Sequence, residues 1–241
     1  MSKPPVESAD AQAHWLGRLT HELKTPLATA RGYLELLARP PHGPLDDARA
    51  DLVERARRNL DRLARQLDRM VEFSRLQRGL RGADPEATDF ANLLRMAVSR
   101  LDALEPGGAA VSLAGVPDDW PIDADPDLLL LLALELLDNA RRHGRPPVRL
   151  ALDRDGAFTV LSVSDGGPGP GAEALAAFAA AGAPLVPFPA QGGRLGIGLA
   201  IVRGAAAELG GGAACTANPE GGCTVTLRIP GRAAAETGVG D

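Results

Sequence analysis

The chain has 241 residues, of which 45% are hydrophobic and 3% aromatic, so it is long enough for two small domains with cores of Leu, Val and Ala. Residues 1–82 carry 15 basic against 11 acidic side chains, and the rest of the chain carries 11 against 20. There is no long basic run, no aliphatic run that could span a bilayer and no signal-peptide pattern at the start. We therefore expect a cytoplasmic protein that binds neither nucleic acid nor membrane.

Two amphipathic helices are predicted in the first third of the chain. Apolar residues recur every three or four positions up to Leu37, which predicts a helix over about residues 10–38. The Pro- and Gly-rich segment 39–44 predicts a turn, and a second apolar stripe predicts a helix over about 45–80. Because one antiparallel hairpin buries each stripe on one side only, we expect two hairpins to form a four-helix bundle in a homodimer.

A candidate phosphoryl acceptor lies on the first helix. His21 is two positions from both Leu19 and Leu23, so it is predicted on the polar face, which Thr25 shares one turn later. The segment 18–27, Arg-Leu-Thr-His-Glu-Leu-Lys-Thr-Pro-Leu, resembles the H-box of sensor histidine kinases from two-component systems. The resemblance implies that His21 accepts a phosphoryl group and that Glu22 orients or deprotonates its imidazole. It also implies that Thr25 positions water for dephosphorylation of a response regulator.

Residues 79–88 are predicted to be an interdomain linker, followed by a mixed α/β domain. Asp125 and Pro126 are typical of a helix start. The spacing of Cys215 and Cys223 fits neither a metal knuckle nor a disulfide framework, so both are interpreted as small apolar strand residues in a reducing compartment. Helices are predicted at 89–104, 126–142 and 198–209, and strands at 110–113, 120–122, 148–152, 157–163, 213–217 and 224–229.

Three motifs follow one another in this second domain. The segment 135–143, Glu-Leu-Leu-Asp-Asn-Ala-Arg-Arg-His, lies on a predicted helix; the segment 165–169, Asp-Gly-Gly-Pro-Gly, follows a predicted strand; and the Gly-rich segment 192–202 opens a helix. In this order they resemble the N, G1 and G2 boxes of the Bergerat ATP-binding fold, which histidine kinases share with gyrase-type and mismatch-repair ATPases. The resemblance implies a site for ATP and Mg²⁺.

Particular residues of the chain take family roles through this resemblance. Asn139 would hold Mg²⁺ and Arg142 would contact phosphate, while Asp165 would accept a hydrogen bond from the adenine amino group. Glu135 departs from the pattern, since many such kinases have Asn there and gyrase-type relatives have Glu. Its carboxylate is interpreted as a Mg²⁺ ligand, as a base acting on imidazole or water, or as a silent substitution. The glycines implied to lie against the nucleotide are Gly167, Gly169, Gly193, Gly196 and Gly198.

The segment between the second and third motifs, roughly 170–191, is interpreted as a lid over the nucleotide. Phe178 or Phe188 is the candidate remnant of the family's F-box. The segment is rich in alanine and poor in the charged residues usual in such lids, so closure of the lid is the part of the resemblance that this sequence supports least.

The predicted fold is α+β. A helical hairpin in residues 1–82 forms a dimeric antiparallel four-helix bundle, an α/β-sandwich Bergerat-type ATP-binding domain covers 83–231, and 232–241 is a flexible tail. The predicted function is ATP-dependent phosphorylation of His21 and transfer of the phosphoryl group to an aspartate of a response regulator receiver domain, with regulator phosphatase activity and a separate sensor protein as further expectations. Two alternatives remain open: a non-catalytic histidine phosphotransfer adaptor, and a conformational switch that hydrolyses ATP without using His21.

Overall fold

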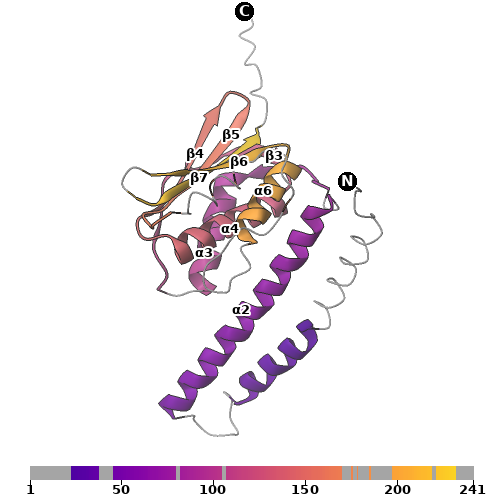
Figure 1. Cartoon of the computed structure of the whole chain (residues 1–241), viewed down its shortest axis with the longest axis vertical. Coiled ribbons are helices and arrows are strands. Elements are labelled where there is room, and N and C mark those ends of the chain that lie inside the picture. The colour runs from indigo at the N-terminus through magenta and orange to yellow at the C-terminus, as the bar shows by residue number, and fades with distance from the viewer. Residues whose placement is uncertain are drawn as a thin grey trace, which may run out of the picture. The chain divides into compact units, whose positions relative to one another are not determined.

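The computed structural model describes residues 23–37, 46–79, 82–104, 107–169, 197–218 and 221–231, together with Leu175, Phe178 and Leu185 (Figure 1). The chain divides into two compact units, Met1–Arg75 and Leu76–Asp241. The first is helical and the second combines helices with two sheets. This is the predicted order of a helical region followed by an α/β domain.

The first unit contains a helical hairpin, built from the helix at residues 23–37 and from α2 (Asp47–Gln77), whose last two residues belong to the second unit. Ion pairs join Lys24 to Asp68 and Arg31 to Asp61, the latter with 3.4 Å between Nη1 and Oδ1. From Lys24 to Arg31 the first helix advances by seven residues, while the paired residue on α2 moves back by seven, from Asp68 to Asp61. The two helices are therefore antiparallel, as predicted. Large apolar side chains nevertheless remain exposed on this hairpin: Leu23, Tyr33, Leu36, Leu37, Leu52 and Leu63.

The second unit is built on a five-stranded sheet with the order β2-β4-β5-β7-β6. Strands β2 and β4 are parallel and the other neighbours are antiparallel. A separate two-stranded sheet pairs β1 with β3. The strands are β1 (Glu86–Asp89), β2 (Val111–Gly115), β3 (Pro121–Ala124), β4 (Val148–Asp155), β5 (Phe158–Ser164), β6 (Gly212–Ala217) and β7 (Cys223–Pro230).

Three helices cover one face of the large sheet: α3 (Phe90–Leu104), α4 (Pro126–His143) and α6 (Gly198–Glu208) (Figure 1). The alternation along β5 and β7 shows which face is covered, because every second residue is buried. These core-facing residues are Thr159, Leu161 and Val163 of β5 and Cys223, Val225, Leu227 and Ile229 of β7. The predicted two-layer α/β sandwich is therefore confirmed.

The start of α4 was also predicted correctly. Oδ1 of Asp125 accepts hydrogen bonds from the backbone N–H groups of Asp127 and Leu128, at 2.9 and 3.0 Å, which satisfies two amide groups at the helix start. Its Oδ2 accepts a third from the N–H of Asp84 at 3.1 Å. One buried carboxylate thus fixes both the start of α4 and the segment that enters the domain.

The prediction of a linker over residues 79–88 was wrong at its end, because Glu86–Asp89 form β1. The ladder pairs Glu86 with Ala124 and Thr88 with Ile122. The four residues Glu-Ala-Thr-Asp contain no apolar run, so the local sequence carries no strand signal. The pairing with β3, more than thirty residues away, supplies the hydrogen bonds that make this segment a strand.

Candidate nucleotide-binding site

Asp165 is positioned by β5 and β7, two neighbouring inner strands of the sheet. It directly follows β5 and continues the core-facing row that contains Leu161 and Val163. The β5–β7 register places Val163 opposite Val225, so the next core-facing pair is Asp165 and Cys223. The Asp165 N–H donates to the Cys223 carbonyl at 3.0 Å, which extends the ladder by this pair. The result is a nearly buried carboxylate, 7% exposed, at the end of the sheet core.

The Asp165 side chain is held on both oxygens. Oδ1 accepts the N–H of Gly167 at 2.8 Å, and Oδ2 accepts the Cys223 S–H at 3.3 Å. The backbone carbonyl of Asp165 accepts Nδ2 of Asn218 at 3.2 Å. An ionised carboxylate offers about four lone-pair positions, so each oxygen can accept one further hydrogen bond. The carboxylate is thus fixed in orientation and can accept from a ligand amino group.

Two glycines that sequence reasoning missed pack directly against Asp165. A Cβ on Gly144, just after α4, would lie 2.5 Å from Cβ and Cγ of Asp165. A Cβ on Gly222, which has φ +90, would lie 1.9 Å from the Asp165 carbonyl oxygen. Neither position has room for a side chain. The end of α4 and the start of β7 therefore both meet at Asp165, a convergence that only the three-dimensional pairing reveals.

Helix α4 carries the residues predicted for the phosphate and metal end of the site. Glu135 is 6% exposed, whereas Asn139 and Arg142 are half-buried, and the Arg142 guanidinium forms an ion pair with Asp138. Asn139 precedes Gly144 by five residues, so it lies on the helix whose C-terminal end packs against Asp165.

Of the five predicted glycines, three fall within the described residues. Gly167 donates its N–H to Asp165, and Gly169 has φ +71, a conformation that favours glycine. Gly198 is the first residue of α6, whose N-cap residue, Ile197, makes no side-chain capping bond. The first-turn N–H groups of α6 thus receive no cap from that residue. Gly193 and Gly196 lie outside the described residues.

The predicted phosphoacceptor region is only partly described. His21 and Glu22 lie outside the described residues, as does Phe188 of the predicted lid. Thr25 is exposed on the helix at residues 23–37, in the first unit, and its carbonyl accepts the Thr29 hydroxyl at 3.0 Å. Phe178, the other F-box candidate, is 2% exposed.

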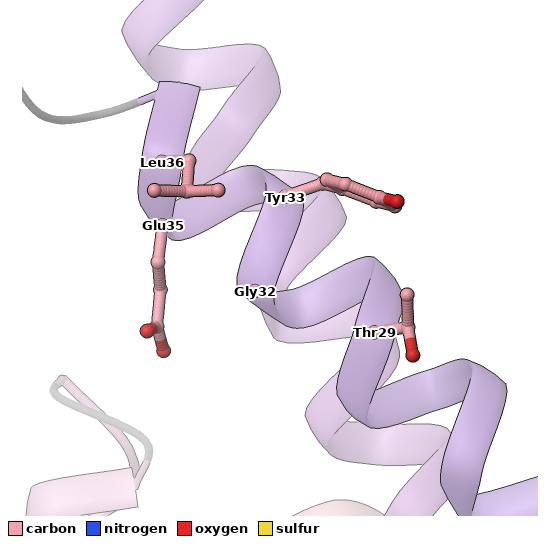
Figure 2. Close-up of a pocket in the computed structure, with 5 residues that line it drawn as sticks. All are labelled: Thr29, Gly32, Tyr33, Glu35 and Leu36. Atoms are coloured by element: carbon pink, nitrogen blue, oxygen red, sulfur yellow. The ribbon is translucent and has the colours of Figure 1, made fainter.

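A shallow depression on the hairpin does not coincide with this site. It is lined by Thr29, Gly32, Tyr33, Glu35 and Leu36, all from the helix at residues 23–37. Figure 2 shows their side chains diverging from one another rather than converging on a common point. Since small-molecule sites need convergent polar groups in an enclosed cavity, we do not interpret the depression as a ligand site.

Family models match both units of the chain. The model described as His Kinase A (phospho-acceptor) domain matches residues 11–79, and the model described as Histidine kinase-, DNA gyrase B-, and HSP90-like ATPase matches residues 124–233. Among the described residues, no helix combines the length and apolar character needed to cross a membrane.

Individual proteins are similar over nearly the whole chain. Histidine protein kinase DivJ of Caulobacter vibrioides is 28% identical over 240 residues, covering 92% of this chain and 38% of the relative. A probable sensor histidine kinase, HK, of Mycobacterium tuberculosis is 32% identical over 221 residues, covering 88% and 54%. The crystal structure of full-length ShkA in complex with AMPPNP superposes with a TM-score of 0.68 at 26% identity, covering 90% of this chain and 46% of that one.

The chain spans about two fifths to half the length of these relatives. Within that span, both family models occur in the order in which the hairpin and the α/β unit follow one another. The chain belongs to the sensor histidine kinases.

Proposed function

We propose that this chain is an ATP-dependent protein-histidine autokinase that passes its phosphoryl group to an aspartate on a response regulator receiver domain. The observation that carries the proposal is the fixed, buried carboxylate of Asp165, which lies against the end of the helix that bears Asn139. Family membership supplies the class of reaction, and the residues of this chain supply the particular roles argued below.

Asp165 selects adenine through its hydrogen-bonding character. A carboxylate accepts hydrogen bonds and donates none, so it favours a base with an amino group over one with a carbonyl at the same place. The Gly167 N–H and the Cys223 S–H hold the carboxylate in one orientation before the nucleotide arrives. Pre-orientation of this kind lowers the entropy lost on binding.

The triphosphate end of the nucleotide is assigned to α4 and to the start of α6. Asn139 and Glu135 offer hard oxygen ligands one turn apart on α4, which suits Mg²⁺ that keeps its remaining positions for phosphate and water. Arg142, now paired with Asp138, can turn to a phosphate oxygen instead. The N-terminus of α6 adds N–H donors and a favourable dipole. Bound Mg²⁺ would neutralise charge on the phosphates.

In the phosphoryl transfer, a ring nitrogen of His21 forms a bond to the γ-phosphorus while the bond from that phosphorus to the β–γ bridging oxygen breaks, and ADP leaves. Glu22 is assigned to orient the imidazole and accept its proton. The phosphoryl group then moves from His21 to the carboxylate of the receiver domain. Thr25, exposed on the hairpin, is assigned to a separate reaction, in which water removes the phosphoryl group from the regulator as inorganic phosphate.

A homodimer is part of the proposal. The six large apolar side chains that remain exposed on the described hairpin are more than a solvated helix surface requires. Pairing with a second hairpin would bury them in a four-helix bundle.

Asp165→Asn tests the proposal at the residue that carries it. The change removes a charge-assisted hydrogen bond worth roughly 1.5–3 kcal/mol, so ATP should bind about 10- to 150-fold more weakly. The amide can donate to a carbonyl, so the variant should lose much less affinity for inosine triphosphate, which has a carbonyl in place of the amino group. Calorimetric titration of both nucleotides measures this, and an equal loss for the two, or no loss, would remove Asp165 from adenine recognition.

Two measurements separate the proposal from its alternatives. A phosphotransfer adaptor without catalytic activity would bind neither ATP nor inosine triphosphate, and the fixed Asp165 carboxylate argues against this alternative. An ATP-driven switch would bind ATP but leave no acid-labile, base-stable label on the protein.

A further inference from the structure

The two cysteines of the chain lie next to each other although seven residues separate them. Strands β6 and β7 are antiparallel neighbours, with Cys215 opposite Val225 and Ala217 opposite Cys223. Cys215 and Cys223 are therefore diagonal neighbours on the same, core-facing side of the sheet. Each thiol shifts the pKa of the other, which is consistent with neighbouring side chains, and both cysteines are free.

Cys223 is also the residue most closely tied to Asp165. Its thiol donates to Oδ2 of that carboxylate at 3.3 Å, and its carbonyl accepts the Asp165 N–H at 3.0 Å. Any covalent change at the Cys223 sulfur removes the first contact, and any shift of its backbone disturbs the second.

The two thiols differ in their chemistry. Cys223 is buried, and its contact with Cys215 together with burial raises its pKa far above the usual thiol range. Cys215 lies on β6, the edge strand, and is half-buried, and its contact with the Cys223 thiol lowers its pKa. The thiolate is the reactive form of cysteine, so Cys215 reacts first and Cys223 keeps its proton for Asp165.

We propose that Cys215 and Cys223 form a dithiol–disulfide modification site that controls adenine recognition by Asp165, a proposal that rests on the function proposed above. The oxidant is a small disulfide such as oxidised glutathione. The Cys215 thiolate attacks one sulfur, so that a Cys215–glutathione bond forms, the glutathione disulfide breaks and one glutathione thiolate leaves. The Cys223 sulfur then attacks the Cys215 sulfur while its proton passes to Oδ2 of Asp165, which already accepts the Cys223 S–H. The second glutathione leaves as a thiolate and takes up this proton. The two cysteines lose two electrons, and one glutathione disulfide becomes two thiols.

The strand geometry links this bond to the nucleotide site. Diagonal neighbours have Cα atoms about 7–8 Å apart, whereas a relaxed disulfide spans about 4.4–6.8 Å, so closing the bond draws the ends of β6 and β7 together. Gly222, next to Cys223, already has no space for a Cβ against the Asp165 carbonyl. Movement of this part of β7 therefore displaces Asp165, in addition to removing the thiol donor. A bond formed under such strain is readily reduced, which suits reversible control.

The experiment uses the full chain, whose only thiols are these two. Reduced protein is treated with oxidised glutathione, free thiols are counted with a chromogenic disulfide reagent, and ATP affinity is measured by calorimetry. We expect the thiol count to fall from two to none, with a mass change that corresponds to an internal disulfide and no bound glutathione. The ATP dissociation constant should rise about 5- to 50-fold, since a thiol is a weaker donor than the groups usually bound to carboxylates, and dithiothreitol should restore it.

Two variants serve as matched controls. Cys215→Ser cannot form the disulfide and keeps the Cys223 thiol on Asp165, so its ATP affinity should equal that of the reduced wild type with or without the oxidant. Cys223→Ser cannot form the disulfide either, so the oxidant should cause no change in its ATP dissociation constant relative to the same untreated variant.

Three results would overturn the inference while leaving the proposed function intact: an oxidised protein without free thiols that binds ATP as before, glutathione on both cysteines with no internal disulfide, or the same loss of affinity in Cys215→Ser. If the reduced wild-type protein does not bind ATP, the proposed function fails and this inference fails with it.

Discussion

Glu135 is a buried carboxylate one turn before Asn139 on α4, the helix to which we assign the phosphate end of the nucleotide. A base in this place can activate water against ATP as well as assist the imidazole. We therefore expect slow ATP hydrolysis alongside autophosphorylation. Glu135→Gln keeps the shape and removes the base, so it should lower phosphate release in a His21→Gln background, where water is the remaining acceptor.

The matched control for Glu135 is Asp127→Asn, an equal charge change in the exposed first turn of the same helix. It should leave phosphate release unchanged. The water-activating role fails if release from the His21→Gln protein already equals the rate without enzyme, or if Glu135→Gln leaves it as it was.

Thr25 provides a second prediction at the residue scale. Its side chain is exposed, so Thr25→Ala should cost little stability and should leave autophosphorylation unchanged. Dephosphorylation of the phosphorylated regulator should slow, because that reaction needs the hydroxyl to position water. Thr29→Ala, one turn further along the same exposed helix, is the control and should behave as wild type. Equal lifetimes of the phosphorylated regulator with both variants would make Thr25 an ordinary helix residue.

At the scale of elements, Asp125 connects α4 to the segment that enters the domain. It accepts three backbone N–H groups, two in the first turn of α4 and one from Asp84. Asp125→Ala should lower the free energy of unfolding of the second unit by about 1–2 kcal/mol, because helix caps of this kind contribute that much. Asp125→Asn keeps one acceptor oxygen and should lose less. Urea denaturation followed by circular dichroism measures both, and an equal loss in the two variants would contradict the capping role.

Local signals in the sequence were sufficient for elements whose stabilising contacts are near in sequence. The apolar stripes predicted the two hairpin helices, Asp125 and Pro126 predicted the start of α4, and the strands predicted at 148–152 and 157–163 correspond to β4 and β5. Strand β1 was missed because β3 makes it a strand. The parallel pairing of β2 with β4 likewise depends on partners far apart in the chain.

The residues of the candidate site also differ in whether a local motif could predict them. Asp165 and Asn139 stood out because each belongs to a motif within a few residues. Cys223, Gly144 and Gly222 did not, since their importance comes from the register between β5 and β7 and from the end of α4 meeting Asp165. The alternation of apolar residues in 223–229 was the one local signal that placed Cys223 on the core face, and it could not show what lay opposite.

At the scale of the whole molecule, the function requires a nucleotide site in one unit and an acceptor histidine in the other. The two units carry distinct features: the proposed ATP site around Asp165, and a hairpin with exposed apolar side chains that suits a dimer. The proposed reaction connects them through one bond, between the γ-phosphorus of ATP and a ring nitrogen of His21.

Incubation of the full chain with Mg²⁺ and ATP labelled in the γ-phosphate tests that bond most directly. The chain has four histidines, and His14, on the same predicted helix, provides the matched control. The wild type and His14→Gln should both incorporate label that is acid-labile and base-stable. His21→Gln should incorporate none, while it binds ATP and sediments as a dimer like the wild type. Label on His21→Gln at the wild-type level would contradict the assignment of His21 as the phosphoryl acceptor.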